Sequence, residues 1–198
     1  MHKQSFLSDL NAAPVIAAVK NNEELEESLR SSCRAVFVLY GNLVEISDIV
    51  KKIHASGKKA VVHIDLIDGL AARESAVDFI RNTHAYGIIS TKGMLIRRAK
   101  QLGMIAIQRF FLLDSLALSN IPKQISLNSP DFIEVIPGGM PKIIRELCSA
   151  TQTPVIAGGL IRDTIDIANA LNAGAIALSV SRENLWALND NITESSPT

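Results

Sequence analysis

Short apolar runs recur along the whole chain, and a stretch with helical spacing follows each of them. The distance between runs is too long for β-hairpins and suits parallel strands that are joined by crossover helices. Eight such β-then-α units in series favour a closed barrel over an open doubly wound sheet. We therefore predict an α/β fold, a compact single-domain (β/α)8 TIM-like barrel. The predicted strands are Pro14–Val19, Ala35–Tyr40, Lys59–Leu66, Tyr86–Ser90, Met104–Gln108, Asp131–Pro137, Pro154–Gly158 and Ala175–Ser179.

The composition agrees with strands that are buried on both faces. Aromatic residues make up only 5% of the chain although 47% is apolar, so the core must consist of Ile, Val, Leu and Ala. Buried parallel strands favour such residues. Helix signals lie between the runs: Asp163 precedes an apolar periodic segment and Asp166 follows three residues later, which resembles a capping box.

The chain shows no linker and no low-complexity run, so we expect residues 1–188 to form one barrel domain. The amphipathic segment Gln4–Leu10 is expected to plug the bottom of the barrel or to add a helix. Residues 189–198 are polar, without an apolar anchor, and we expect them to be a disordered tail.

Charge and cysteine content limit the function and the compartment. Twenty basic and twenty acidic residues give a net charge of zero, which argues against a dedicated nucleic-acid binder. No signal peptide and no long uncharged apolar run is visible, so we expect no membrane contact. Cys33 and Cys148 lack metal-ligand spacing, so we expect no metal site. We predict a cytoplasmic protein.

The candidate phosphate site lies after the last strands, because sites in β/α barrels form at the carboxyl ends of the strands. Gly158 and Gly159 can bring main-chain N–H groups close to a ligand, and a similar glycine pair begins at Gly138. Ser181 is expected to cap a short helix, whose amino end would attract an anion. Alternatively, the glycines form an ordinary tight turn and Arg182 lies in solvent. The predicted phosphate site comprises Gly138, Gly158, Gly159, Ser179, Ser181 and Arg182.

Three charged residues close to strand ends are candidates to bind ligand hydroxyl groups. Glu134 points away from the side of Ile133 and Val135, and a charge within an apolar strand needs a partner. Asp65 is expected on one face with His63, and Lys20 is a possible counterion for either carboxylate. The alternative is an internal salt-bridge network. We interpret His63 itself as a core residue with a satisfied ring.

Two surface features have a weaker interpretation. Arg97, Arg98 and Lys100 lie outside the apolar stripe of their helix, so they form an exposed basic edge and a candidate RNA contact. Such edges are usually solvated helix faces, and no aromatic residues interleave with this one. The apolar region 110–118 is either core or half of a homodimer interface.

Several of these segments resemble the glycerol uptake operon antiterminator regulatory protein family, whose members respond to glycerol 3-phosphate. The resemblance extends from Pro14 to Leu188. The most selective part is the stretch His63–Leu70, since the Gly-Gly-Leu-Ile turn after strand seven is shared by many phosphate-binding barrels. The segments concerned are Pro14–Lys20, His63–Leu70, Gly87–Lys92, Glu134–Gly138, Pro154–Ile161 and Ala177–Ser181.

The resemblance implies a regulator with glycerol 3-phosphate as its effector and no cofactor. The liganded protein would act on the leader mRNA of glycerol-utilisation genes, so that transcription passes a terminator. We therefore predict a non-catalytic antiterminator. The alternative is a small phosphate-ester-binding enzyme of the lyase, isomerase or phosphodiesterase type, with Asp65 and Glu134 as acid and base. The sequence shows no paired-histidine motif, metal cluster or activated nucleophile to support it. A barrel that has lost its ligand is a third reading.

Overall fold

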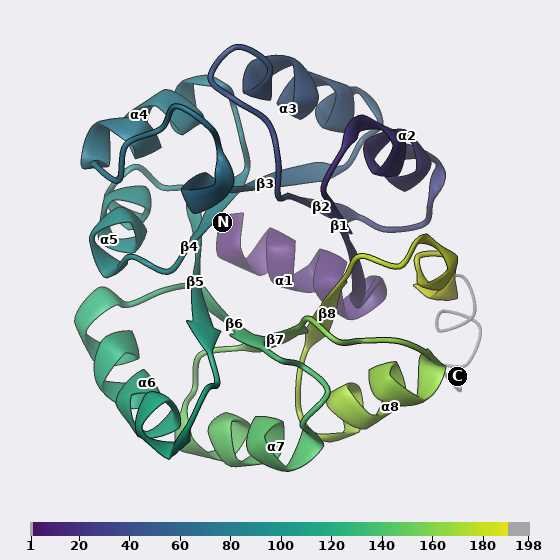
Figure 1. The fold of residues 1–198 in the computed structure, drawn as a ribbon, viewed down its shortest axis with the longest axis vertical. Helices are drawn as coiled ribbons and strands as arrows, with labels where there is room; N and C mark the ends of the chain where they lie inside the picture. The colour runs from purple at the N-terminus through teal and green to yellow at the C-terminus, as the bar shows by residue number, and fades with distance from the viewer. Residues whose placement is uncertain (1, 190–198) are drawn as a thin grey trace.

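The barrel is closed and follows the order of the chain. The computed structural model describes residues 2–189, and all eight strands run parallel, with β8 pairing back onto β1. Figure 1 looks down the barrel and shows α2 to α8 as an outer ring. The predicted fold class is confirmed. The strands are β1 (Val15–Val19), β2 (Ala35–Val38), β3 (Lys59–His63), β4 (Gly87–Ser90), β5 (Ile105–Phe111), β6 (Phe132–Ile136), β7 (Val155–Gly158) and β8 (Ala177–Val180).

The helices alternate with the strands, and two short 3-10 turns, η1 and η2, add to them. They are α1 (His2–Ala12), α2 (Asn22–Arg30), α3 (Ile46–Ala55), η1 (Ile64–Leu66), α4 (Glu74–Asn82), α5 (Gly93–Gln101), α6 (Ser115–Asn128), α7 (Pro141–Ala150), α8 (Thr164–Asn172) and η2 (Glu183–Leu185). At the start of α8, Asp163 caps the helix as expected and accepts from the amides of Ile165 and Asp166 at 2.9 Å.

Two strand boundaries differ from the sequence prediction by three residues, and the others differ by no more than two. β3 ends at His63, and the next residues form η1, so Asp65 is not on a strand. β5 continues to Phe111, because its last residues still pair with β6: Arg109 lies opposite Glu134 and Phe111 opposite Ile136. Part of the apolar run at 110–118 is therefore strand rather than helix.

Alternate residues of each strand divide the core into two layers. One layer lies between the sheet and the outer helices. The other fills the barrel itself with residues such as Ile16, Phe37, Val61 and Ile107. This is the expected pattern for strands buried on both faces.

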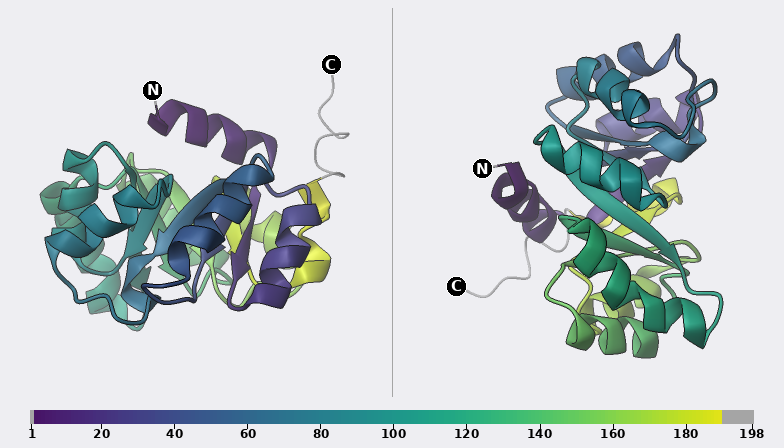
Figure 2. Two further views of the ribbon diagram at one scale, coloured as in Figure 1. Left: turned by 90° about the horizontal axis from the view of Figure 1, so that it is seen from above. Right: turned by 90° about the vertical axis from the view of Figure 1, so that its left-hand side faces the viewer.

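Helix α1 closes the amino-terminal end of the barrel, as expected for Gln4–Leu10. Phe6 and Leu10 are buried among the inward-facing residues, and the Phe6 ring meets Phe132 edge-on at 5.3 Å. Figure 2 shows α1 lying across one end of the molecule. The opposite, carboxyl-terminal end is thus the open one.

The barrel includes one residue that the sequence analysis assigned to a disordered tail. Asn189 is 2% exposed, and its amide group exchanges two hydrogen bonds of 3.0 Å with the main chain of Val15. The domain therefore extends beyond residue 188. The rest of the predicted tail, 190–198, lies outside the described residues. No helix within 2–189 is long and apolar enough to cross a membrane.

Candidate functional site

A cavity of about 260 Å³ opens at the carboxyl ends of the strands. It lies where sites form in barrels of this architecture. Its lining comes from β1, β5, β6 and β8 and from the loops after β1, β2, β7 and β8. The lining residues are Ala18, Lys20, Leu39, Arg109, Glu134, Ile136, Gly159, Leu160, Ile161, Ser179, Val180 and Ser181.

A buried ion pair forms the floor of this cavity. Glu134 is fully buried, and its two carboxylate oxygens accept from Arg109 Nε at 2.6 Å and from Ser179 Oγ at 2.5 Å. Glu134 thus faces inward, away from the side of Ile133 and Val135, as predicted. Its counterion is Arg109 and not Lys20, because Arg109 lies directly opposite on the neighbouring strand. Within residues 2–189 the two terminal amino groups of Arg109 make no hydrogen bond.

The cavity has an excess of positive charge. Lys20 lines it and forms no ion pair with any described residue. Lys20 and Arg109 against Glu134 leave one formal positive charge, since the lining holds no other ionisable side chain. Such a pocket favours an anionic ligand, because Lys20 has no counter-charge among the lining residues once Glu134 is paired with Arg109.

The turn after β7 has an unusual main-chain conformation. Gly159 and Leu160 have φ angles of +70° and +58°, which a leucine rarely adopts. Such conformations cluster at ligand-binding sites. The amides of Gly159, Leu160 and Ile161 have no hydrogen-bond acceptor among the described residues. The turn therefore offers main-chain donors next to the cavity, as the sequence analysis expected.

The two glycine pairs do lie side by side, but Gly138 has no free donor. Its amide is occupied by the carbonyls of Gly158 at 2.5 Å and Gly159 at 3.0 Å. Gly138 and Gly158 do not line the cavity. Gly158 instead lies beneath it, where a side chain would collide with Ser179 and Glu134.

The turn after β8 differs from the predicted capped helix. η2 is a single 3-10 turn of three residues, its N-cap is Arg182, and no side chain caps it. Ser181 is therefore not a helix cap, and so short a turn has almost no macrodipole. Ser181 does line the cavity, and its amide has no acceptor within residues 2–189. Arg182 is exposed and does not line the cavity.

Asp65 belongs to a separate polar network. Its carboxylate accepts from Ser90 Oγ and the Thr91 amide at 2.8 Å and from Thr91 Oγ1 at 2.9 Å, and Lys92 lies 3.7 Å away. Burial raises the pKa of Asp65, but the hydrogen bonds from Thr91 and Ser90 outweigh it, so the pKa is lowered. Asp65 does not line the cavity, and the internal network is the arrangement observed.

His63 is buried without a full set of hydrogen bonds to its ring. The residue is 3% exposed, and its ring Nδ1 has no hydrogen-bond partner among the described residues. Burial, followed by the charge of Arg109, lowers the pKa of His63 to about 4. The expectation of a satisfied ring was therefore wrong.

The predicted basic edge of α5 carries no unpartnered cation. Arg97 donates to Asn128 at 2.5 Å, Arg98 pairs with Asp78 at 2.6 Å, and Lys100 pairs with Asp131. These side chains are held by the neighbouring elements, which weakens their role as a free basic surface.

The region 110–118 presents apolar side chains beside the β5–α6 loop. Phe111, Leu113 and Leu116 are exposed, Leu113 by 84%. They lie near a hollow of about 420 Å³ between the starts of α6 and α7. A dimer through this region stays a prediction.

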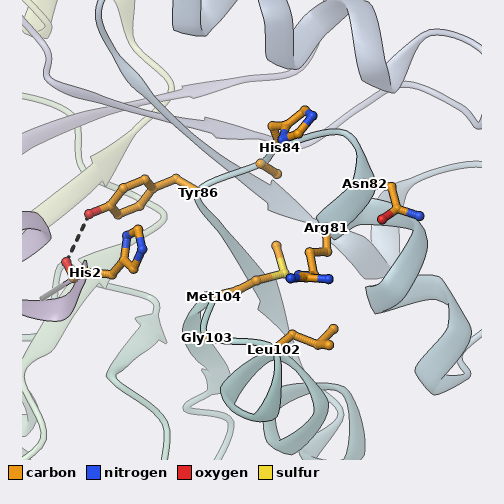
Figure 3. A pocket seen from close by; sticks show the side chains of 9 residues that line it. His2, Arg81, Asn82, His84, Tyr86, Leu102, Gly103 and Met104 are labelled. Carbon is orange, nitrogen blue, oxygen red and sulfur yellow. Dashed lines mark hydrogen bonds between the residues drawn. The ribbon is translucent and has the colours of Figure 1, made fainter.

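A larger hollow, of about 690 Å³, lies at the opposite end of the barrel (Figure 3). It sits between the turns that lead into β4 and β5, beside the start of α1. In residues 2–189 no group of His, Cys, Asp or Glu side chains is arranged to hold a metal ion. The lining of the hollow is His2, Arg81, Asn82, His84, Ala85, Tyr86, Leu102, Gly103 and Met104.

Of the predicted site residues, the structure brings Lys20, Glu134, Gly159, Ser179 and Ser181 to one cavity. Arg109, which contributes the central cation, was not among the predicted site residues. The signal was available: with β5 extended, Ile105, Ile107 and Arg109 alternate onto one face.

Comparisons with known proteins relate the chain to others over most of its length. A family model described as "Glycerol-3-phosphate responsive antiterminator" matches residues 15–186. Uncharacterized protein YgcP of Escherichia coli K12 is 44% identical over 180 residues, 90% of this chain and 94% of its own. The glycerol uptake operon antiterminator regulatory protein of Listeria monocytogenes is 36% identical with a TM-score of 0.84, covering 87% of this chain and 94% of its own. A glycerol uptake operon antiterminator-related protein of Thermotoga maritima is 31% identical with a TM-score of 0.79, covering 87% and 96%.

Proposed function

Because the chain belongs to the glycerol-3-phosphate responsive antiterminator family, we propose that it senses glycerol 3-phosphate and acts, without catalysis, on the leader mRNA of glycerol-utilisation genes. Effector binding at the carboxyl-end cavity would favour the RNA-competent state over the inactive one. The proposal puts the protein in the cytoplasm, where leader transcripts are made.

One observation carries the effector assignment: the cavity combines unpaired cationic groups with unpaired main-chain donors. Lys20 and the terminal amino groups of Arg109 can neutralise a phosphate dianion. The amides of Gly159, Leu160 and Ser181 can donate to its oxygens. Glu134 retains lone pairs on both carboxylate oxygens, so it can also accept from a ligand hydroxyl. A polyol phosphate fits this set better than a neutral polyol.

The state of the two carboxylates favours a sensor over an enzyme. An acid or base catalyst needs an oxygen that is free to exchange a proton with the substrate. Glu134 lines the cavity, but Asp65 accepts three hydrogen bonds outside it, so the acid–base pair that the enzyme alternative requires is not brought together there. No observation favours the enzyme alternative.

The direct test combines calorimetry, RNA retention and a turnover assay on the purified protein. We expect glycerol 3-phosphate to bind more tightly than inorganic phosphate, and glycerol not to bind. Filter retention of a glycerol-gene leader transcript should rise with the effector, and the effector should be recovered intact. Turnover of glycerol 3-phosphate, or retention that is independent of it, would contradict the proposal.

Lys20→Met tests the cavity itself. Lys20 is exposed and pairs with no described side chain, so the variant should fold normally. Loss of one charge-assisted contact, worth about 1.5–3 kcal/mol, should weaken glycerol 3-phosphate binding by about tenfold or more. Lys51→Met, on the exposed side of α3, is the matched control and should bind normally. Equal affinities of the two variants would exclude Lys20 from the site.

Two further parts of the proposal concern surfaces. A homodimer would form through residues 110–118, which expose Phe111, Leu113 and Leu116. The α5 edge of Arg97, Arg98 and Lys100 is the first candidate contact for RNA, and charge reversal at Arg97 tests it. All three side chains are already bound to other groups of the protein, so a different surface could provide the RNA contact instead.

A further inference from the structure

A continuous groove with basic walls crosses the amino-terminal end of the barrel. It consists of the 690 Å³ hollow in Figure 3 and an adjoining one of about 270 Å³. The two share His2, Gly103 and Met104, and the second adds Lys3 and Lys100. We call this surface the amino-end groove.

The charge of the groove is one-sided. Lys3 and Arg81 are exposed, and neither forms an ion pair with a described residue. Asp131 is the one acidic side chain in either lining, and it is already neutralised by Lys100. Two cations are therefore left without a counter-charge.

Helix electrostatics explain only one of these two cations. Arg81 lies in the last turn of α4, where a basic residue is stabilised by the helix macrodipole. Lys3 lies in the first turn of α1, which contains no acidic residue, so its charge opposes the macrodipole there. An anionic partner in the groove would compensate for this arrangement.

Flat and polar groups line the groove beside these cations. The Tyr86 hydroxyl donates to the main-chain carbonyl of His2 at 3.0 Å, and the two rings meet edge-on at 5.5 Å. Figure 3 shows Tyr86 and His2 on one side of the hollow and Arg81 with Met104 facing them. Aromatic rings and guanidinium groups are the groups on which an unpaired nucleobase can pack.

We propose that the amino-end groove is the surface that binds single-stranded leader RNA. Phosphates lie at Lys3 and Arg81, and an unstacked base enters the hollow between Tyr86 and Met104. This inference rests on the proposed function, because that function supplies the RNA. It differs from the α5 edge, whose cations are held by protein groups.

Strand β6 connects this groove to the effector cavity. Phe132 and Glu134 lie two residues apart on its inward face. Glu134 forms the floor of the cavity, whereas the Phe132 ring contacts Phe6 of α1 and lies 5.9 Å from Lys3 Nζ. A shift of β6 on effector binding would thus move the α1 wall of the groove, which gives the two sites a shared element.

The test uses the full chain with the double substitution Lys3→Glu and Arg81→Glu. The matched control, Lys51→Glu with Lys142→Glu, changes the net charge equally on exposed residues elsewhere. A third protein carries Arg97→Glu. Binding of the leader transcript is titrated with saturating glycerol 3-phosphate at several salt concentrations, and effector affinity is measured separately by calorimetry.

We expect the groove variant to bind RNA at least tenfold more weakly. Its salt slope should fall by about 1.4, at about 0.7 per phosphate contact of a single strand, while effector affinity stays unchanged. The control should behave like the wild type. RNA affinity equal to the control, or a loss confined to Arg97→Glu, would overturn the inference and leave the proposed function intact. Failure of the wild type to bind RNA would instead remove the proposed function and the groove with it.

Discussion

At the scale of single residues, Gly158 is a position where one added carbon would disturb the floor of the cavity. A Cβ at 158 would lie 2.5 Å from Ser179 Oγ and 2.7 Å from Glu134 Oε1, so the bond between them could not persist unchanged. We expect Gly158→Ala to lower the free energy of unfolding by about 1–3 kcal/mol in urea titrations. At Gly139 the nearest atom to a Cβ is 3.6 Å away, so Gly139→Ala should stay within about 0.5 kcal/mol. Equal changes in the free energy of unfolding for the two variants would show that position 158 has room for a Cβ beside Ser179 and Glu134.

The pKa of His63 predicts how stability depends on pH. The folded-state pKa of about 4 lies below the ordinary value of 6.5, so between these values the unfolded chain binds a proton that the folded one does not. Stability should therefore fall as the pH drops from 6.5 towards 4, by up to about 3 kcal/mol. His63→Asn should flatten the curve in this window, as followed by thermal unfolding. The pKa of His54 is also lowered, but His54 is present in both the wild type and the variant. The difference between their two stability curves therefore reports on His63.

What the sequence could reveal about the site depended on strand alternation. That alternation predicted the inward direction of Glu134, and the paired strands made the two glycine turns neighbours. It could not reveal which cation pairs with Glu134, because the counterion is determined by the strand register and by the extension of β5. Asp65 was misassigned because β3 ends at His63 and Asp65 lies within η1, where the strand alternation no longer holds.

At the scale of elements, every strand was recognisable from its apolar run, whereas the ends were set by pairing with neighbours. Helix α1 is the element whose role is easiest to isolate. Phe6 fills the amino end of the barrel, so Phe6→Ala should lower the free energy of unfolding by about 3–5 kcal/mol. Ser8→Ala, on the exposed side of the same helix, is the control and should change it little. Chemical denaturation followed by circular dichroism measures both, and similar values would mean that α1 does not seal the barrel.

At the scale of the whole molecule, the exposed apolar side chains gather at the carboxyl end. Residues 110–118 contribute Phe111, Leu113 and Leu116. If two copies associate there, Leu113→Glu should yield a monomer in light scattering after size-exclusion chromatography, where the wild type elutes as a dimer. Lys51→Glu, a charge change on the exposed side of α3, should leave the dimer intact. A monomeric wild type would contradict the dimer.

Pairing of β1 with β8 has a consequence for biosynthesis. These strands come from the two ends of the chain, and the side chain of Asn189 fastens the closing seam at Val15. A nascent chain on the ribosome therefore keeps an unpaired strand edge until its final segment has emerged. A chain that is truncated before β8 would therefore keep unpaired strand edges, which are covered in the closed barrel, and would be prone to associate through them.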